Sequence, residues 1–120
     1  MQGKTEIKID GLSYGIIFNN LAIGEAFTRF GLNPLSGEIK GIFAILKLIY
    51  CGMVAYAEMN NKDVPTYEIF LEHYANDEID QTQFEGIFKA FTESKVVSAT
   101  LQQANELAGD TKKKVNPKKK

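Results

Sequence analysis

Side chains that could support catalysis are few in this sequence. There is one histidine, His73, and one cysteine, Cys51, so a nucleophile, a base and an orienting group cannot be assembled with both. Cys51 lies within an apolar stretch, and we expect a small buried side chain rather than a nucleophile. His73 lies off the apolar stripe of its predicted helix and is expected at the surface. The sequence therefore predicts a protein that is not an enzyme.

Acidic residues gather near His73, but their spacing does not predict a metal site. His73 and Asp77 are placed to share one helix face, yet two ligands do not make a site. The segment with Asp77, Glu78 and Asp80 lacks the glycine bend and the distal glutamate of a calcium loop. The glycines of "DGLSYGIIF" are not followed by the GK[ST] of a phosphate loop. We therefore predict no metal and no cofactor, with solvated loop and helix-capping roles for the acids.

A β-hairpin is predicted over residues 5–18. Asp10-Gly11 is a strong two-residue turn signal between two alternating apolar segments. This turn pairs Ile9 with Leu12 and Ile7 with Tyr14, all on one face of the hairpin. Two strands alone are marginal, so this face is expected to pack on helices.

The rest of the chain shows helical periodicity. The first predicted helix is capped by Asn19 or Asn20 and ended by Gly31, and a central helix over 37–59 is capped by Ser36. A third predicted helix has Pro65 in its first turn, and a fourth begins with an Asp80–Gln83 capping box. A weaker helical segment is predicted over 95–108. The fold class predicted is mainly α, a bundle of four to five helices with an N-terminal β-hairpin. A single domain over 1–109 is expected, followed by a disordered lysine-rich tail over 110–120.

The central run "IFAILKLIYCGMVAYA", residues 42–57, could in principle lie in a membrane or in a core. A helix of this length rises about 24 Å, against about 30 Å for the hydrocarbon of a bilayer. Lys47 lies within the run, and a charge there is costly in lipid. We predict a buried central helix with no membrane partner. Gly41, Gly52 and Ala55 share a flank where another backbone can approach closely, and self-association into a homo-oligomer is left open.

Charge is distributed unevenly along the chain. Residues 112–120 hold six of the fourteen basic residues and no acid, which leaves eight basic and fifteen acidic residues in 1–111, a net charge of −7. A lysine block of this kind is typical of a solvated tail that makes non-specific phosphate contacts. The acidic body would repel phosphate, so no specific nucleic-acid partner is predicted.

The segment over 95–108 has an apolar stripe that is too thin to anchor a helix firmly. It is interpreted either as plain tail or as a segment that orders against a partner. The predicted partner-binding residues are Val97, Leu101, Ala104, Leu107, Lys112, Lys113 and Lys114.

The order of these segments resembles the tail assembly chaperones of long-tailed, siphovirus-like phages. The likeness spans about residues 5–95 and is carried by "IDGLSYGIIFN", "LAIGEAFTRFG", "ILKLIYCGMVAYAEMNN", "PTYEIFLEHY" and "DQTQFEGIFKAFTES". The resemblance implies a protein without catalytic activity or cofactor that works in the cytoplasm of the bacterial host. It implies that the protein coats the aggregation-prone tape measure protein until tail tube subunits polymerise around it.

The resemblance also implies a longer product of the same gene made by ribosomal frameshifting, which would be a further partner. The lysines at 112–114 or 118–120 fit this idea, because consecutive lysine codons can form an adenine-rich slippery run. The alternative is a small regulatory or adaptor protein that binds a host factor or nucleic acid through its basic tail. Salt-sensitive retention on DNA or RNA that is lost on deleting 112–120 would favour that alternative.

Overall fold

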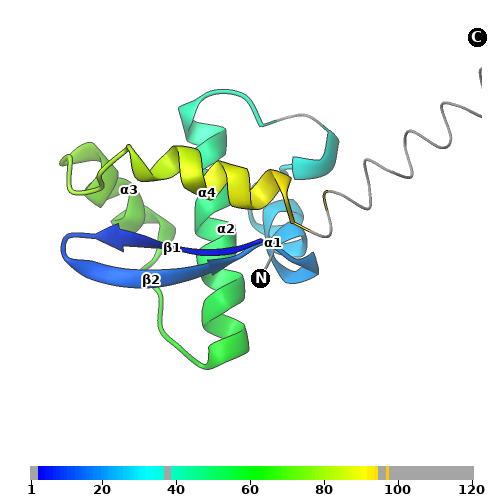
Figure 1. Ribbon diagram of the computed structural model, residues 1–120, viewed down its shortest axis with the longest axis horizontal. Helices are drawn as coiled ribbons and strands as arrows, with labels where there is room; N and C mark the ends of the chain where they lie inside the picture. The colour runs from blue at the N-terminus through cyan, green and yellow to red at the C-terminus, as the bar shows by residue number, and fades with distance from the viewer. Residues whose placement is uncertain (1–2, 37–38, 95–96, 98–120) are drawn as a thin grey trace, which may run out of the picture.

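The computed structural model describes residues 3–36, 39–94 and 97 (Figure 1). Within these residues two strands, β1 (Lys4–Ile9) and β2 (Leu12–Ile17), precede four helices, and a short 3₁₀ turn spans Pro34–Ser36. The helices are α1 (Asn20–Phe30), α2 (Ile42–Asn60), α3 (Tyr67–Ala75) and α4 (Gln83–Thr92). The predicted hairpin is confirmed, and the four helices of this part of the chain fit the predicted four to five.

The hairpin has the predicted register. Ile7 pairs with Tyr14 and Ile9 with Leu12 in an antiparallel ladder. Asp10 and Gly11 have φ angles of 49° and 83°, as the primed two-residue turns require. One expectation is wrong: Leu12 is 62 % exposed although Ile9 opposite it is 1 % exposed. The reason is that the cover over Ile9 comes from the β1 side, where Ile9 forms an isolated antiparallel bridge with Ile79.

Helix α2 is the centre of the core. It packs against β2 and against α1, while α4 contacts β1, and Figure 1 shows the blue hairpin crossing α2 with the yellow α4 alongside. The helices are thus arranged around a hairpin, and the predicted bundle arrangement is not confirmed. Gly52 is essential to this packing, because a Cβ there would lie 2.6 Å from Cγ2 of Ile16 and 2.9 Å from Cε1 of Phe18. The atoms that approach Gly52 belong to side chains, whereas a backbone was predicted there.

By length and composition α2 could cross a membrane. An 18-residue window within Ile42–Asn60 has a mean hydropathy of 1.6, and 56 % of that window is buried inside the protein. The core helices of soluble proteins pass the same test. Lys47 on this helix lies with Nζ 5.7 Å from the ring centroid of Phe30, a cation–π distance, which gives the charge a partner at the helix surface.

The beginning and end of α1 follow the sequence signals. Oδ1 of Asn19 accepts hydrogen bonds from the N–H groups of Leu21 and Ala22, at 3.0 and 3.2 Å. Gly31 has a φ of 63°, and its N–H donates to the carbonyl of Phe27. The predicted N-cap and C-terminal glycine are both confirmed.

Three other helix starts differ from the prediction. Helix α2 begins at Ile42 rather than 37, because Gly41 before it has φ 82° and ψ 164°, outside the helical region, so Ser36 does not cap it and Gly41 does not lie on the helix flank. Pro65 does not lie within α3, whose N-cap is Thr66.

The start of α4 is also different from a capping box. Thr82 occupies the N-cap position, and Oδ1 of Asp80 accepts from both the N–H and the hydroxyl of Thr82. These hydrogen bonds lower the pKa of the Asp80 carboxyl. The side-chain amide of Gln83 donates to the Asp80 carbonyl and reaches further, to strand β1.

Candidate functional site

Most of the predicted partner-binding residues lie outside the described residues. This applies to Leu101, Ala104, Leu107, Lys112, Lys113 and Lys114. Val97 is described, and it is 8 % exposed within the same hydrophobic cluster as Phe18 and Phe91. The side chain of Val97 therefore serves the core.

The two residues considered for catalysis are in different environments. Cys51 is fully buried, as predicted, and burial raises the pKa of its thiol to about 12, so the thiol is protonated at neutral pH. The side chain of His73 is 25 % exposed, and its Nδ1 lies 2.7 Å from Oε1 of Glu78. A buried neutral thiol of this kind is inert as a nucleophile.

Two hollows meet along the C-terminal half of α2, and we call them together the α2 trough. The first, about 400 Å³, lies between the hairpin, α2 and the segment 62–64. The second, about 650 Å³, lies between the start of α1 and the end of α2. Ala57, Lys62 and Val64 line both hollows, so the two hollows are adjacent and share these residues.

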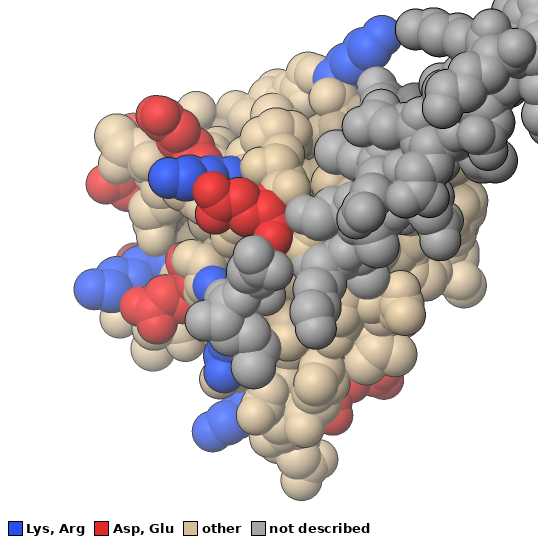
Figure 2. All heavy atoms as spheres, turned by 45° about the vertical axis from the view of Figure 1, so that its right-hand side comes forward, with Lys and Arg blue, Asp and Glu red and all other residues tan. Residues whose placement is uncertain are grey.

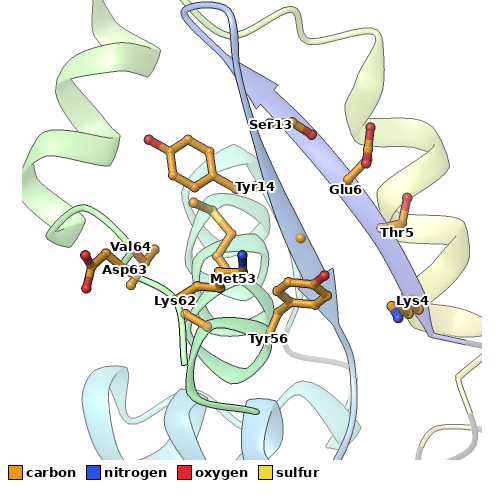
Figure 3. Close-up of a pocket in the computed structure, with 12 residues that line it drawn as sticks. Lys4, Thr5, Glu6, Ser13, Tyr14, Met53, Tyr56, Lys62, Asp63 and Val64 are labelled. Atoms are coloured by element: carbon orange, nitrogen blue, oxygen red, sulfur yellow. The ribbon is translucent and has the colours of Figure 1, made fainter. Parts of the chain in front are cut away.

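The hairpin half of the trough has an apolar middle and polar sides (Figure 3). Tyr14, Met53 and Tyr56 lie along its middle, and Figure 3 shows Lys62 and Asp63 on one side with Thr5 and Glu6 of β1 on the other. This combination of apolar floor and charged rim is typical of surfaces that bind amphipathic segments.

A glycine shapes this half of the trough. A Cβ added to Gly15 would overlap the ring of Tyr56, so only glycine at this position lets the ring lie across β2. Nζ of Lys4 lies 5.7 Å from the centroid of the same ring. The ring therefore joins the last turns of α2 to the outer side of the hairpin.

The α1 half of the trough carries exposed apolar side chains. Leu21 and Met59, which line it, are 46 % and 56 % exposed. Phe27 of α1 is 50 % exposed, and Phe43, at the opposite end of α2, is 63 % exposed. Leu21 and Met59, which lie in the groove, favour contact with an apolar surface of another chain.

Acidic side chains outnumber basic ones over α3, α4 and the connection between them, mostly in α3 and the connection. Glu68, Glu72, Asp77, Asp80 and Glu85 are all exposed there, and Lys89 is the one lysine in the range 67–92. In the described part of the chain the ion pairs are Glu25–Arg29 and His73–Glu78, so these five acids have no salt-bridge partner. Figure 2 shows many charged side chains toward the left of the molecule, the side where Figure 1 places the hairpin turn and α3.

A second group of polar residues meets at the hairpin turn. One ligand atom each of Asp10, His73 and Glu78 lies within 4.8 Å of the others. Sequence spacing suggested Asp77 as the neighbour of His73, but the structure places Glu78 and the distant Asp10 there. Only the Asp-Gly turn signal pointed to the position of Asp10, and nothing in the sequence showed that this turn reaches α3.

The chain matches no protein-family model, no curated protein sequence and no solved structure. Its function is therefore inferred from the trough, the acidic surface and the hairpin turn.

Proposed function

We propose that this protein is a phage tail assembly chaperone that holds amphipathic helical segments of the tape measure protein in the α2 trough. In this role it keeps the client soluble in the cytoplasm of the bacterial host while the tail tube polymerises, with no cofactor. The observation that carries the proposal is the trough itself, with Tyr14 and Tyr56 in one hollow and the exposed Leu21 and Met59 in the other.

The shape of the trough suits a helical client. A helix that binds in a groove presents apolar residues at i, i+3, i+4 and i+7 and keeps its polar face in water. Tyr14 and Val64, which are partly exposed, offer apolar contacts along the trough, and Lys62 and Asp63 offer both charges at its rim. The affinity expected from such a mixed surface is modest, which allows the client to be released when the tube assembles.

The charge of the body suits the same role. Residues 1–111 have a net charge of −7, and the acids of α3 and α4 have no salt-bridge partners within the described residues. An acidic chaperone attracts a basic client and keeps a complex with exposed apolar surface dispersed.

Substitutions in the trough test this proposal. Leu21→Asp and Met59→Asp place a charge on an exposed side chain, so the fold tolerates them, but the charge would be desolvated beneath a bound helix. We expect affinity for the tape measure protein to fall about tenfold or more. The measurement is the soluble fraction of the tape measure protein on co-expression, followed by co-purification and a binding titration.

Phe43→Asp is the matched control. Phe43 is equally exposed but lies about 24 Å from Met59 along α2, outside both hollows. Equal loss of binding in Phe43→Asp and Met59→Asp would move the client to another surface. A tape measure protein that is equally soluble without this chain, or that never co-purifies with it, would refute the chaperone role altogether.

The predicted contribution of the C-terminal segment calls for a separate truncation. Because Val97 belongs to the core, the chain is cut after residue 97. We expect weaker client binding with an unchanged melting temperature. If the full chain binds DNA or RNA in a salt-sensitive way, and the truncated chain loses this binding but keeps the client, the alternative of a regulatory protein with a basic tail is favoured.

A further inference from the structure

Asp10, His73 and Glu78 come from three separate parts of the fold. Asp10 is in the hairpin turn, His73 is in the last turn of α3, and Glu78 is in the connection to α4. Their ligand atoms nevertheless all lie within 4.8 Å of one another. Side chains so far apart in sequence converge only because the tertiary structure brings them together.

The backbone around this group holds the three residues in place. The N–H of Asp10 donates to the carbonyl of Glu78 at 3.1 Å, and the N–H of Glu78 donates to the carbonyl of His73 at 2.8 Å. Next to them, the bridge between Ile9 and Ile79 is buried on both sides. The three side chains therefore extend from a backbone framework that is fixed before any ligand binds, which lowers the entropic cost of binding.

We propose that Asp10, His73 and Glu78 form a binding site for a divalent first-row transition-metal ion, with Zn²⁺ as the best candidate. The group combines one imidazole nitrogen with carboxylate oxygens from two residues, a donor set that suits Zn²⁺ better than Mg²⁺ or Ca²⁺. Ligand atoms around a tetrahedral Zn²⁺ lie about 3.3 Å apart, so side-chain movements of about 1.5 Å complete the site.

Solvent can reach this site and complete the coordination. Asp10 and Glu78 line an open hollow of about 590 Å³. The side chains of His73 and Glu78 are 25 % and 39 % exposed, so water can occupy the remaining position. The hydrogen bond between His73 and Glu78 is exchanged for two metal–ligand bonds when the ion binds.

Metal binding would fasten the hairpin turn to the end of α3. Since the ion binds the folded arrangement of all three residues and not the unfolded chain, it stabilises the fold by mass action. This inference does not depend on the proposed chaperone function.

The test uses the full chain without a polyhistidine tag. Zn²⁺ at about 100 times its dissociation constant is expected to raise the melting temperature by about 5 °C or more, with the constant measured by calorimetric titration. His73→Gln, Asp10→Asn and Glu78→Gln should each weaken binding at least about tenfold. Mg²⁺ and Ca²⁺ at the same concentrations should leave the melting temperature unchanged.

Asp77→Asn is the matched control. It removes one negative charge next to the site without removing a ligand, and asparagine tolerates the φ of 60° at this position. Full Zn²⁺ affinity in Asp77→Asn together with loss in the three ligand variants supports the site. No Zn²⁺ effect on the wild type, or an equal effect in His73→Gln, overturns it.

Discussion

The two edges of the hairpin end in different ways. At the β1 edge, the side chain of Gln83 pairs with the backbone of Lys8 as a neighbouring strand would: its Oε1 accepts from the Lys8 N–H at 2.8 Å, and its Nε2 donates to the Lys8 carbonyl at 3.0 Å. The bridge between Ile9 and Ile79 extends the same edge. The polar groups of this edge are thus partly satisfied from within the chain.

The β2 edge has no such partners. Lys8 points its backbone groups outward, so Ser13, which pairs with it, and Gly15, two residues further, also point theirs outward. In the described part of the chain no hydrogen bond from outside the hairpin reaches the backbone of either residue. What lies against Gly15 is the ring of Tyr56, at the α2 trough.

The difference shows how a two-stranded hairpin is kept folded without becoming a site for unwanted strands. An exposed edge recruits other strands unless it is paired or covered. The β1 edge is closed in part by hydrogen bonds, whereas the β2 edge has none from outside the hairpin within the described residues, and the Tyr56 ring packs where a Cβ of Gly15 would lie. The β1 edge therefore contributes more to stability, and the β2 edge is the one next to the surface proposed to bind a client.

Removing the Ile79 side chain, which covers β1 at Ile9, should have the largest effect on the free energy of unfolding. Ile79→Ala deletes a side chain that is 1 % exposed and packs beside Ile9, so a cavity of several methyl groups remains. We expect the free energy of unfolding to fall by about 3 kcal/mol, measured by urea denaturation. Ile69→Ala, on an isoleucine that is 44 % exposed, should cost less than about 1 kcal/mol.

Similar losses at the two isoleucines would contradict this account. The result would mean that the 78–80 segment is not anchored on β1 and that the β1 edge is no more closed than the β2 edge. An unchanged m-value in both variants is needed for the comparison, because it shows that the unfolded states are alike.

Substitution of Gln83 should have the next largest effect on the free energy of unfolding. Gln83→Ala removes both hydrogen bonds to Lys8 and leaves two backbone groups of an edge strand without a partner from the protein. We expect a loss of about 1–2 kcal/mol and faster hydrogen exchange at the Lys8 amide. Gln81→Ala is the control, since the Gln81 side chain makes no hydrogen bond within the described residues. Unchanged exchange at Lys8 would show that water replaces Gln83 at no cost.

The sequence predicted those features whose causes are local. The Asp10-Gly11 turn fixes the hairpin register, and the cap at Asn19 and the glycine at Gly31 delimit α1, because each signal acts on its own neighbours. The apolar stripe of α4 was predicted for the same reason, and Phe84, Ile87 and Phe91 are buried.

Features that depend on distant contacts could not be predicted. Nothing in the sequence shows that Gln83 reaches a strand 75 residues away or that Ile79 in a polar loop is a core residue. The start of α2 was missed because the backbone of Gly41 leaves the helical region although the apolar pattern continues. The α2 trough was missed because it depends on how three elements pack, and the residues predicted to bind a partner lie mostly outside the described chain.

Removing the contact between the Tyr56 ring and β2 should have the smallest effect on the free energy of unfolding. Substitutions at two glycines distinguish this contact from the difference in backbone propensity between glycine and alanine. Gly24 lies inside α1 with no atom within 4 Å of an added Cβ, so Gly24→Ala should stabilise the protein by about 1 kcal/mol through helix propensity. Gly15→Ala also replaces glycine with a residue that has a better strand propensity. However, the added Cβ displaces the Tyr56 ring from β2 and from Lys4. We expect a net loss of about 1 kcal/mol.

A double-mutant cycle with Tyr56→Ala tests whether the ring causes that loss. Without the ring, the Cβ at residue 15 meets no obstacle, so Gly15→Ala should change sign and stabilise the Tyr56→Ala protein by about 0.5–1 kcal/mol. The free energies of unfolding of the four proteins give the coupling directly. An equal effect of Gly15→Ala in both backgrounds would mean that Tyr56 does not rest on Gly15. The Tyr56 ring would then not pack on β2, and the hairpin half of the trough would lack one of its two aromatic side chains.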